Sequence, residues 1–355
     1  MKTKIKYGIL ILVLILMTGC TRYIKGDDGK TVVNEKTGQS LTENILCRPT
    51  DEETIMLYEA NGYDLSKLPY CVCSDEEISK EKEEVVETTE NTDEDEKKES
   101  TEEVVETEET KENDKDSCEE FTITSGEYDG LWTAIFVKPL AWVILFFGKL
   151  SGKFGLGLII TSVLIRLVLF PLTKKSTEQT EKMKELQPEL ERLEKKYAGK
   201  DPKDREVAMA KSQEMMMLYK KNNVSPLSGC LPALLQLPLL MAFLDAINRV
   251  PAIFEETFIG FHLGTTPRIG IGNGNWLYLT LTILVAVTTY FSFAKAQNNN
   301  SSNPEMAKQT KMMTNCFTIM IIVMSFFMNS ALNIYWIVSN VFTLLQNYLV
   351  KRSMK

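Results

Sequence analysis

Five long apolar runs constrain the fold of this chain more than any other feature of its sequence. Each run is close to the roughly 20 residues that a helix needs to cross about 30 Å of hydrocarbon. Inside a bilayer every backbone polar group must find its partner within the protein, which favours helices for such runs. We therefore expect an all-α integral membrane protein with five transmembrane helices, over residues 154–173, 226–249, 276–294, 312–328 and 331–350.

The basic residues of the connecting loops predict how these helices are oriented. Residues 174–221 hold 13 lysines and arginines, whereas the loop 250–275 has only Arg268. The basic loops and the C-terminus are expected in the cytoplasm, and the N-terminal region outside it. These features predict a multi-pass protein of a cell membrane.

Two helical features are expected next to the spans. In the cytoplasmic loop 174–225, apolar residues recur at intervals of three and four from Met183 to Tyr197, and a second apolar stripe follows Pro202, which predicts a helical hairpin. Residues 130–153 mix apolar stretches with Lys138 and Lys149, which is typical of an external amphipathic helix lying on the membrane surface. A tilted span is the alternative for that segment.

The N-terminal part of the chain reads as exported. Residues 1–19 have the basic start and apolar run of a signal peptide, and the small residues before Cys20 resemble a lipoprotein signal, in which that thiol carries a lipid. An ordinary signal peptide or an uncleaved anchor is the alternative. Residues 20–129 would form an extracytoplasmic extension. Residues 74–120 carry 23 acidic against 6 basic residues, which predicts disorder.

The cysteines of this extension lie where disulfides are permitted. The sequence does not decide how Cys47, Cys71, Cys73 and Cys118 pair. Cys71 and Cys73 are too close in sequence to resemble a common zinc motif, and the single histidine of the chain is His262. We expect neither a metal nor a cofactor.

Four separated motifs resemble the YidC family of membrane protein insertases in order and spacing; they lie at residues 164–173, 185–188, 225–238 and 334–340. The resemblance covers about residues 130–352. It implies a five-helix core, a cytoplasmic hairpin and a hydrophilic groove through which newly made membrane proteins enter the bilayer, with or without the Sec translocon. The implied partners are nascent membrane proteins and lipids, not DNA, and any ribosome contact would rest on the hairpin and the short C-terminal tail.

Arg166 stands out even without this resemblance. A charge near the middle of a span costs about 2.5 to 3.5 kcal/mol on insertion scales and normally faces protein or water. The alternative is that the side chain snorkels to the membrane surface. The resemblance implies that Arg166 supplies the positive charge of the groove, and the predicted groove residues are Arg166, Gln236, Ser292, Trp336 and Asn340. For the amide side chains, hydrogen bonding between helices of the bundle is an equally open interpretation.

Other function classes fit the sequence less well. A small-solute transporter or channel is the alternative function, but the chain shows no internal repeat of the kind that many transporters carry. An enzyme needs a nucleophile with a base or a metal cluster, and the only acidic residue of the spans is Asp245, expected to pair with Arg249 four positions later. We therefore expect no enzymatic activity. The sequence names no client protein.

Overall fold

The computed structural model describes residues 21–26, 28–73, 118–126, 128–200, 204–224, 231–297 and 304–353. These residues are mostly helical, as expected for an all-α chain. The predicted signal peptide, Cys20 and most of the acidic segment, residues 74–117, lie outside the described residues.

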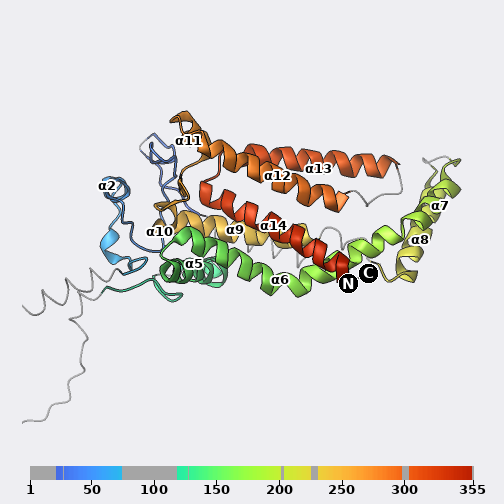
Figure 1. The fold of residues 1–355 in the computed structure, drawn as a ribbon, viewed down its shortest axis with the longest axis horizontal. Helices are drawn as coiled ribbons and strands as arrows, with labels where there is room; N and C mark the ends of the chain where they lie inside the picture. The colour runs from blue at the N-terminus through green and yellow to red at the C-terminus, as the bar shows by residue number, and fades with distance from the viewer. Residues whose placement is uncertain are drawn as a thin grey trace, which may run out of the picture.

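Long helices run side by side along one axis and make the bundle (Figure 1). They are α6 (Phe154–Glu185), α9 (Leu231–Arg249), α12 (Leu277–Gln297), α13 (Pro304–Ser325) and α14 (Ser330–Ser353). Each predicted span overlaps one of these helices, although residue 276 precedes α12 and residues 326–328 follow α13. Among the described residues, two helical stretches qualify by length and composition as candidates for crossing a membrane, Gly130–Ser151 and Phe154–Met183, and Leu277–Phe293 is a shorter apolar helix. The count of five spans and their orientation therefore stay predictions.

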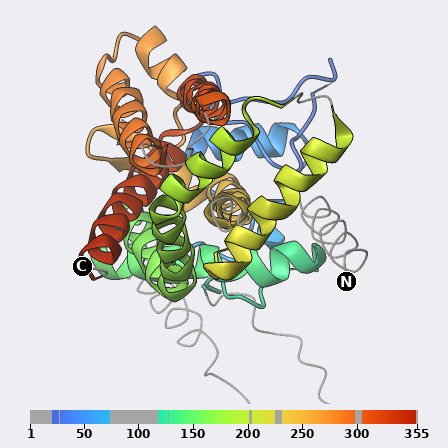
Figure 2. The ribbon, with the colours of Figure 1, turned by 90° about the vertical axis from the view of Figure 1, so that its right-hand side faces the viewer.

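A further helical stretch lies across the bundle. It comprises α4 (Gly130–Trp132), a π-helical turn η2 (Thr133–Val137) and α5 (Lys138–Ser151). Figure 1 shows α5 almost end-on, whereas Figure 2 shows it lengthwise. Glycines bring it close to α6, because a Cβ on Gly157 would lie 2.6 Å from the backbone nitrogen of Gly148. This crosswise placement favours a surface helix, although the stretch is also long enough to span.

The hairpin lies at one end of the molecule and begins later than the sequence suggested. α6 continues through Pro171 to Glu185, so the residues after 173 extend the first predicted span. The hairpin helices are α7 (Gln187–Tyr197), with Pro188 in its first turn, and α8 (Arg205–Lys221), capped by the Asp204 side chain. Proline is tolerated in a first turn because the backbone N–H it lacks has no helical partner there.

At the opposite end the N-terminal extension is folded against the bundle (Figure 1). Its described residues between 21 and 73 and between 118 and 129, which we call the cap, include α2 (Glu52–Ala60) and a 3-10 turn η1 (Leu65–Lys67). Tyr70 forms a parallel bridge with Glu120. The predicted disorder reaches residue 120, whereas Cys118 is joined to Cys73 by a disulfide and Glu120 forms a bridge with Tyr70. The disorder of residues 74–117 stays a prediction.

The cap rests on short elements of the outer loop between α9 and α12. These are α10 (Pro251–Phe254), the antiparallel strands β1 (Thr257–Phe258) and β2 (Phe261–His262), and α11 (Pro267–Gly272). One buried apolar cluster includes Leu46 and Phe121 of the cap together with Phe243 of α9 and Tyr335 of α14. The cap and the bundle therefore share a hydrophobic core.

Candidate functional site

Three helices bring polar side chains together inside the bundle. Arg166 of α6 donates from Nη2 to Oε1 of Gln236 on α9, at 2.5 Å. Gln236 in turn donates from Nε2 to the Tyr335 hydroxyl on α14, at 2.9 Å. The structure thus unites two of the predicted groove residues and adds Tyr335, which the sequence analysis did not select.

The Arg166 guanidinium keeps hydrogen-bonding capacity in this arrangement. Arginine carries five N–H donors. Its Nε is buried and has no hydrogen-bond partner among the described residues. Tyr335, in contrast, is fixed from two sides, because its ring stacks on Phe243 with centroids 4.1 Å apart. The result is a cation held on a rigid support that can still bind an anionic or polar group.

The other predicted groove residues lie in a separate cluster between α12 and α14. Ser292 donates to the Asn340 carbonyl at 3.2 Å, and the Asn340 side chain donates to Thr289 Oγ1 at 2.9 Å. Among the described residues, no hydrogen bond joins this cluster to Arg166. These contacts are the helix-to-helix bonds that the sequence left open as the alternative.

Trp336 is half-buried on α14. It follows Tyr335 directly, and successive helical residues are turned by about 100° around the axis. Trp336 therefore lies on a different face of α14 from the Tyr335 side chain that meets Gln236. Its part in a groove stays a prediction.

Another group of polar residues lies at the outer end of α9. Arg249 is 1% exposed and donates to the Asn44 carbonyl at 2.6 Å, to Thr133 Oγ1 at 3.0 Å and to Asp129 Oδ2 at 2.8 Å. The expected partner, Asp245, instead accepts a hydrogen bond from Trp132 Nε1 at 2.8 Å. The predicted local pair between Asp245 and Arg249 is therefore not formed as a direct ion pair, because Asn44 and Asp129 of the cap and Thr133 of η2 take up the Arg249 side chain.

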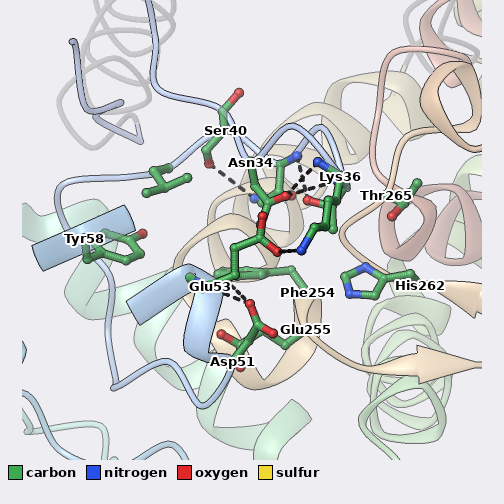
Figure 3. A pocket seen from close by; sticks show the side chains of 14 residues that line it. Asn34, Lys36, Ser40, Asp51, Glu53, Tyr58, Phe254, Glu255, His262 and Thr265 are labelled. Carbon is green, nitrogen blue, oxygen red and sulfur yellow. Dashed lines mark hydrogen bonds and ion pairs between the residues drawn. The ribbon is translucent and has the colours of Figure 1, made fainter. Parts of the chain in front are cut away.

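A cavity of about 430 Å³ lies in the seam between the cap and the outer loop (Figure 3). Cap residues such as Lys36 and Glu53, paired at 2.6 Å, line one side, and Glu255 and His262 line the other. Glu255 Oε2 accepts from the Thr50 backbone N–H at 3.0 Å and from its hydroxyl at 2.7 Å. Burial raises the pKa of Glu255 and lowers the pKa of His262. Among the described residues, no three metal-binding side chains gather in one place.

Of these places, only the Arg166 cluster offers an incompletely bonded cation within the apolar helices. The seam cavity lies among loops outside the bundle, and the buried Arg249 already has three partners.

Comparison with known proteins adds a family to this geometry. Residues 146–355 match the family described as 60Kd inner membrane protein. The membrane protein insertase YidC of Oceanobacillus iheyensis is 36% identical over 227 residues, which is 64% of this chain and 86% of that protein. YidC 2 of Bacillus anthracis is 38% identical over 223 residues, covering 62% and 82%. MisCA of Bacillus subtilis, also a membrane protein insertase, is 37% identical over 221 residues, covering 62% and 79%.

A solved structure is also similar to this chain. It is described as an active YidC insertase crystal structure with the first transmembrane domain resolved. The sequence identity is 27%, the TM-score is 0.43, and the match covers 62% of this chain and 46% of that one.

Proposed function

Since this chain belongs to the 60Kd inner membrane protein family and is a membrane protein insertase, we propose that it draws the polar ends of newly made membrane proteins toward the intramembrane cation Arg166. The observation that supports this proposal is the partly unbonded guanidinium between α6, α9 and α14.

The physical argument is one of desolvation. A client whose acidic or polar tail must cross the bilayer meets a large cost when that tail leaves water. A fixed cation part of the way across lowers this cost, because a charge-assisted hydrogen bond replaces some of the lost hydration. The apolar helix of the client can then move sideways into lipid. The step requires no nucleotide and no covalent chemistry.

The predicted topology gives this site its direction. We propose that the five helices α6, α9, α12, α13 and α14 span the membrane with the hairpin in the cytoplasm and the cap outside. Clients would then approach from the hairpin side, alone or beside the Sec translocon. The short, basic C-terminal end of α14, with Lys351 and Arg352, and the basic hairpin would provide any contact with the ribosome.

We further propose that Cys20 carries a lipid. The described chain begins at Thr21, whose backbone and hydroxyl both donate to Asp245 at the outer end of α9. Because Cys20 directly precedes Thr21, a lipid on Cys20 would lie close to the extracytoplasmic surface of the membrane. Mass spectrometry of the mature N-terminus tests the modification, and an unmodified cysteine would rule it out.

The groove proposal is tested in proteoliposomes with a single-span client that carries an acidic tail. Three forms are compared, namely the intact protein, Arg166→Ala and Arg166→Lys. Arg268→Ala serves as the matched control, because it removes one arginine from an exposed position of the outer loop. Equal amounts of reconstituted protein are confirmed before insertion is measured by protection of the tail from protease.

Loss of insertion in Arg166→Ala, with recovery in Arg166→Lys and full activity in the control, would support a groove that works through its charge. Activity in the intact protein and the control alone would indicate that the planar guanidinium geometry is also required. Equal insertion by all forms would remove Arg166 from the mechanism. The predicted site would then move to the hairpin and the face around Trp336.

A further inference from the structure

We propose that the cap holds α9 from the extracytoplasmic side and thereby fixes the position of Gln236 beside Arg166. The family match begins at residue 146, so the cap lies outside the part of the chain that the family accounts for. The effect on insertion rests on the proposed function. The mechanical coupling does not, because it concerns only how one part of the chain holds another.

Arg249, the last residue of α9, carries most of this argument. Its side chain is almost fully buried, and each of its three nitrogens bonds to a different residue, Asn44, Thr133 or Asp129. Asn44 and Asp129 belong to the cap, and Asn44 Nδ2 also donates to Asp129 Oδ2 at 2.7 Å. A buried charge that loses its partner is strongly destabilising. Among the described residues, the one ion pair of Arg249 is therefore supplied by the cap, through Asp129.

The preceding residue, Asn248, joins the cap, α9 and the start of α14. Its side-chain oxygen accepts from Gln39 of the cap at 3.3 Å and from Asn329, just before α14, at 3.0 Å. Its carbonyl oxygen accepts from the Thr42 hydroxyl at 3.2 Å. Both helices that complete the Arg166 cluster are thus bonded to one point beneath the cap.

The contact continues through backbone and apolar groups. The Leu46 N–H donates to the Arg249 carbonyl at 2.8 Å, which satisfies one of the carbonyls that the end of a helix leaves without a helical partner. Leu46 and the disulfide-bonded Cys47 pack in the same cluster as Phe243 of α9. On the seam side, a cavity separates part of the cap from the outer loop, and bonds such as that from Thr50 to Glu255 join the two (Figure 3). The end of α9 is therefore the place where the cap is attached directly to a helix of the Arg166 cluster.

Helix geometry transmits this attachment to the site. Gln236 and Arg249 lie on the same helix, about 20 Å apart at the rise of an α-helix. A slip of α9 by one residue would turn Gln236 by about 100° and move it by about 1.5 Å along the axis. Either change would break a hydrogen bond of 2.5 Å to Arg166. A fixed outer end of α9 is therefore a condition for the observed cluster.

The test uses the full chain reconstituted in lipid with Arg249→Met, Arg249→Lys and Asp129→Asn. Arg22→Met is the matched control, because Arg22 also pairs with Asp129, at 3.2 Å, but its side chain is 66% exposed. Hydrogen–deuterium exchange of residues 39–48 reports attachment of the cap. Nitroxide labels at Leu167→Cys and Leu237→Cys, in a background without the thiols of Cys230 and Cys316, report the separation of α6 and α9.

We expect Arg249→Met to speed exchange in residues 39–48 by about tenfold or more, to broaden the distance distribution between the labels and to lower insertion. Arg249→Lys should recover part of each effect, and the control should change none. Asp129→Asn keeps the side-chain shape but removes its charge. It tests the same ion pair if the Arg249→Met protein does not accumulate.

Unchanged exchange in both Arg249→Met and Asp129→Asn would overturn attachment through this residue. Faster exchange with an unchanged label distance would overturn the coupling to Gln236. If both physical readouts change as expected while even the intact protein inserts no client, the proposed groove function fails and the role of the cap stands.

Discussion

At the scale of single residues, the sequence shows which polar groups inside apolar runs need a hydrogen-bond partner. It does not show which residue the partner is. Arg166 was predicted because a charge inside an apolar run is costly. Its neighbour Gln236 was selected for the same reason. Tyr335 was missed, since a tyrosine among apolar residues is ordinary and only packing of α14 against α9 brings its hydroxyl to Gln236.

Gln236 offers a direct test of what holds the cation. Gln236→Glu should place a carboxylate next to Arg166, so the guanidinium would be neutralised within the protein and insertion of an acidic client should fall as far as in Arg166→Ala. Gln236→Leu should instead lower stability by about 1 to 3 kcal/mol, because it leaves the buried Arg166 group and the Tyr335 hydroxyl without their shared partner. Thermal unfolding in detergent and the insertion assay separate the two effects. Normal insertion by Gln236→Glu would contradict an electrostatic groove.

Asn340 distinguishes the groove from bundle packing. The Asn340 side chain donates to Thr288 and Thr289 of α12, so Asn340→Ala should weaken the contact between α12 and α14 by about 0.6 kcal/mol, and by no more than about 1.7 kcal/mol, as for other hydrogen bonds between membrane helices. The bond from Ser292 to the Asn340 backbone carbonyl is retained in this variant. Insertion should remain normal if these bonds are structural. A large loss of insertion with unchanged stability would return Asn340 to the groove.

At the scale of elements, periodicity located the hairpin helices and the long runs, whereas the cap depended on pairings that no local pattern reveals. The four external cysteines allow three pairings. The structure selects Cys47–Cys71 and Cys73–Cys118. Bonds such as those from Thr50 to Glu255, 205 positions apart, complete the cap. Contacts at such separations are set by the whole fold, which explains why the sequence predicted only an extracytoplasmic extension without a fold of its own.

The Cys47–Cys71 disulfide should be important for the cap. The two cysteines are 24 positions apart in the sequence. Removing a disulfide that closes a loop of this size lowers the stability of the folded state by about 3 kcal/mol. We expect the double variant Cys47→Ser/Cys71→Ser to exchange amide hydrogens faster across α2 and residues 39–48, while the hairpin α7–α8 is unaffected. Exchange that stays at the rate of the intact protein would show that the apolar cluster alone holds the cap.

The strand β2 introduces a dependence on pH. Burial lowers the pKa of His262 below its ordinary value of 6.5, against a smaller opposite effect of Asp51. Just below pH 6.5 the unfolded segment therefore binds more protons than the folded one. The stability contributed by the neutral His262 is present in full above pH 6.5, and it is lost as the pH falls through the lower pKa of the folded state. Burial of Glu255 has the opposite sign, since its raised pKa removes stability as the pH rises.

We therefore expect acidification from about pH 7.5 to about pH 5.5 to loosen the seam, measured as lower protection factors of the amides at residues 257–265 after division by the intrinsic exchange rate at each pH. His262→Gln should remove most of this change and leave the contribution of Glu255 in place. Since His262 is the only histidine of the chain, no other imidazole contributes. An equal response to pH in His262→Gln would show that His262 does not cause the loosening.

At the scale of the whole molecule, the division of charge and hydropathy along the chain anticipated an external part, a membrane part and a cytoplasmic hairpin. The structure places the cap and the hairpin at opposite ends of the helices (Figure 1). That separation fits a protein whose two ends face different compartments, because the cap is held by disulfides that form outside the reducing cytoplasm. The same disulfides make the orientation testable.

A protease that cleaves after glutamate, added to intact protoplasts, should cut within residues 74–117 and leave α7 and α8 whole. The segment between Cys73 and Cys118 is rich in glutamate, and a cut there leaves the two pieces joined by the Cys73–Cys118 disulfide. The chain should therefore run as one species on a gel without reductant and separate into two when reductant is added. In α7, Glu191 is exposed and Glu194 is half-exposed, so the protease can cleave there once it has access. It should gain that access only after the membrane is broken. Cleavage of the hairpin in intact protoplasts, with the acidic segment protected, would reverse the proposed orientation and place Arg166 in a groove that opens outward.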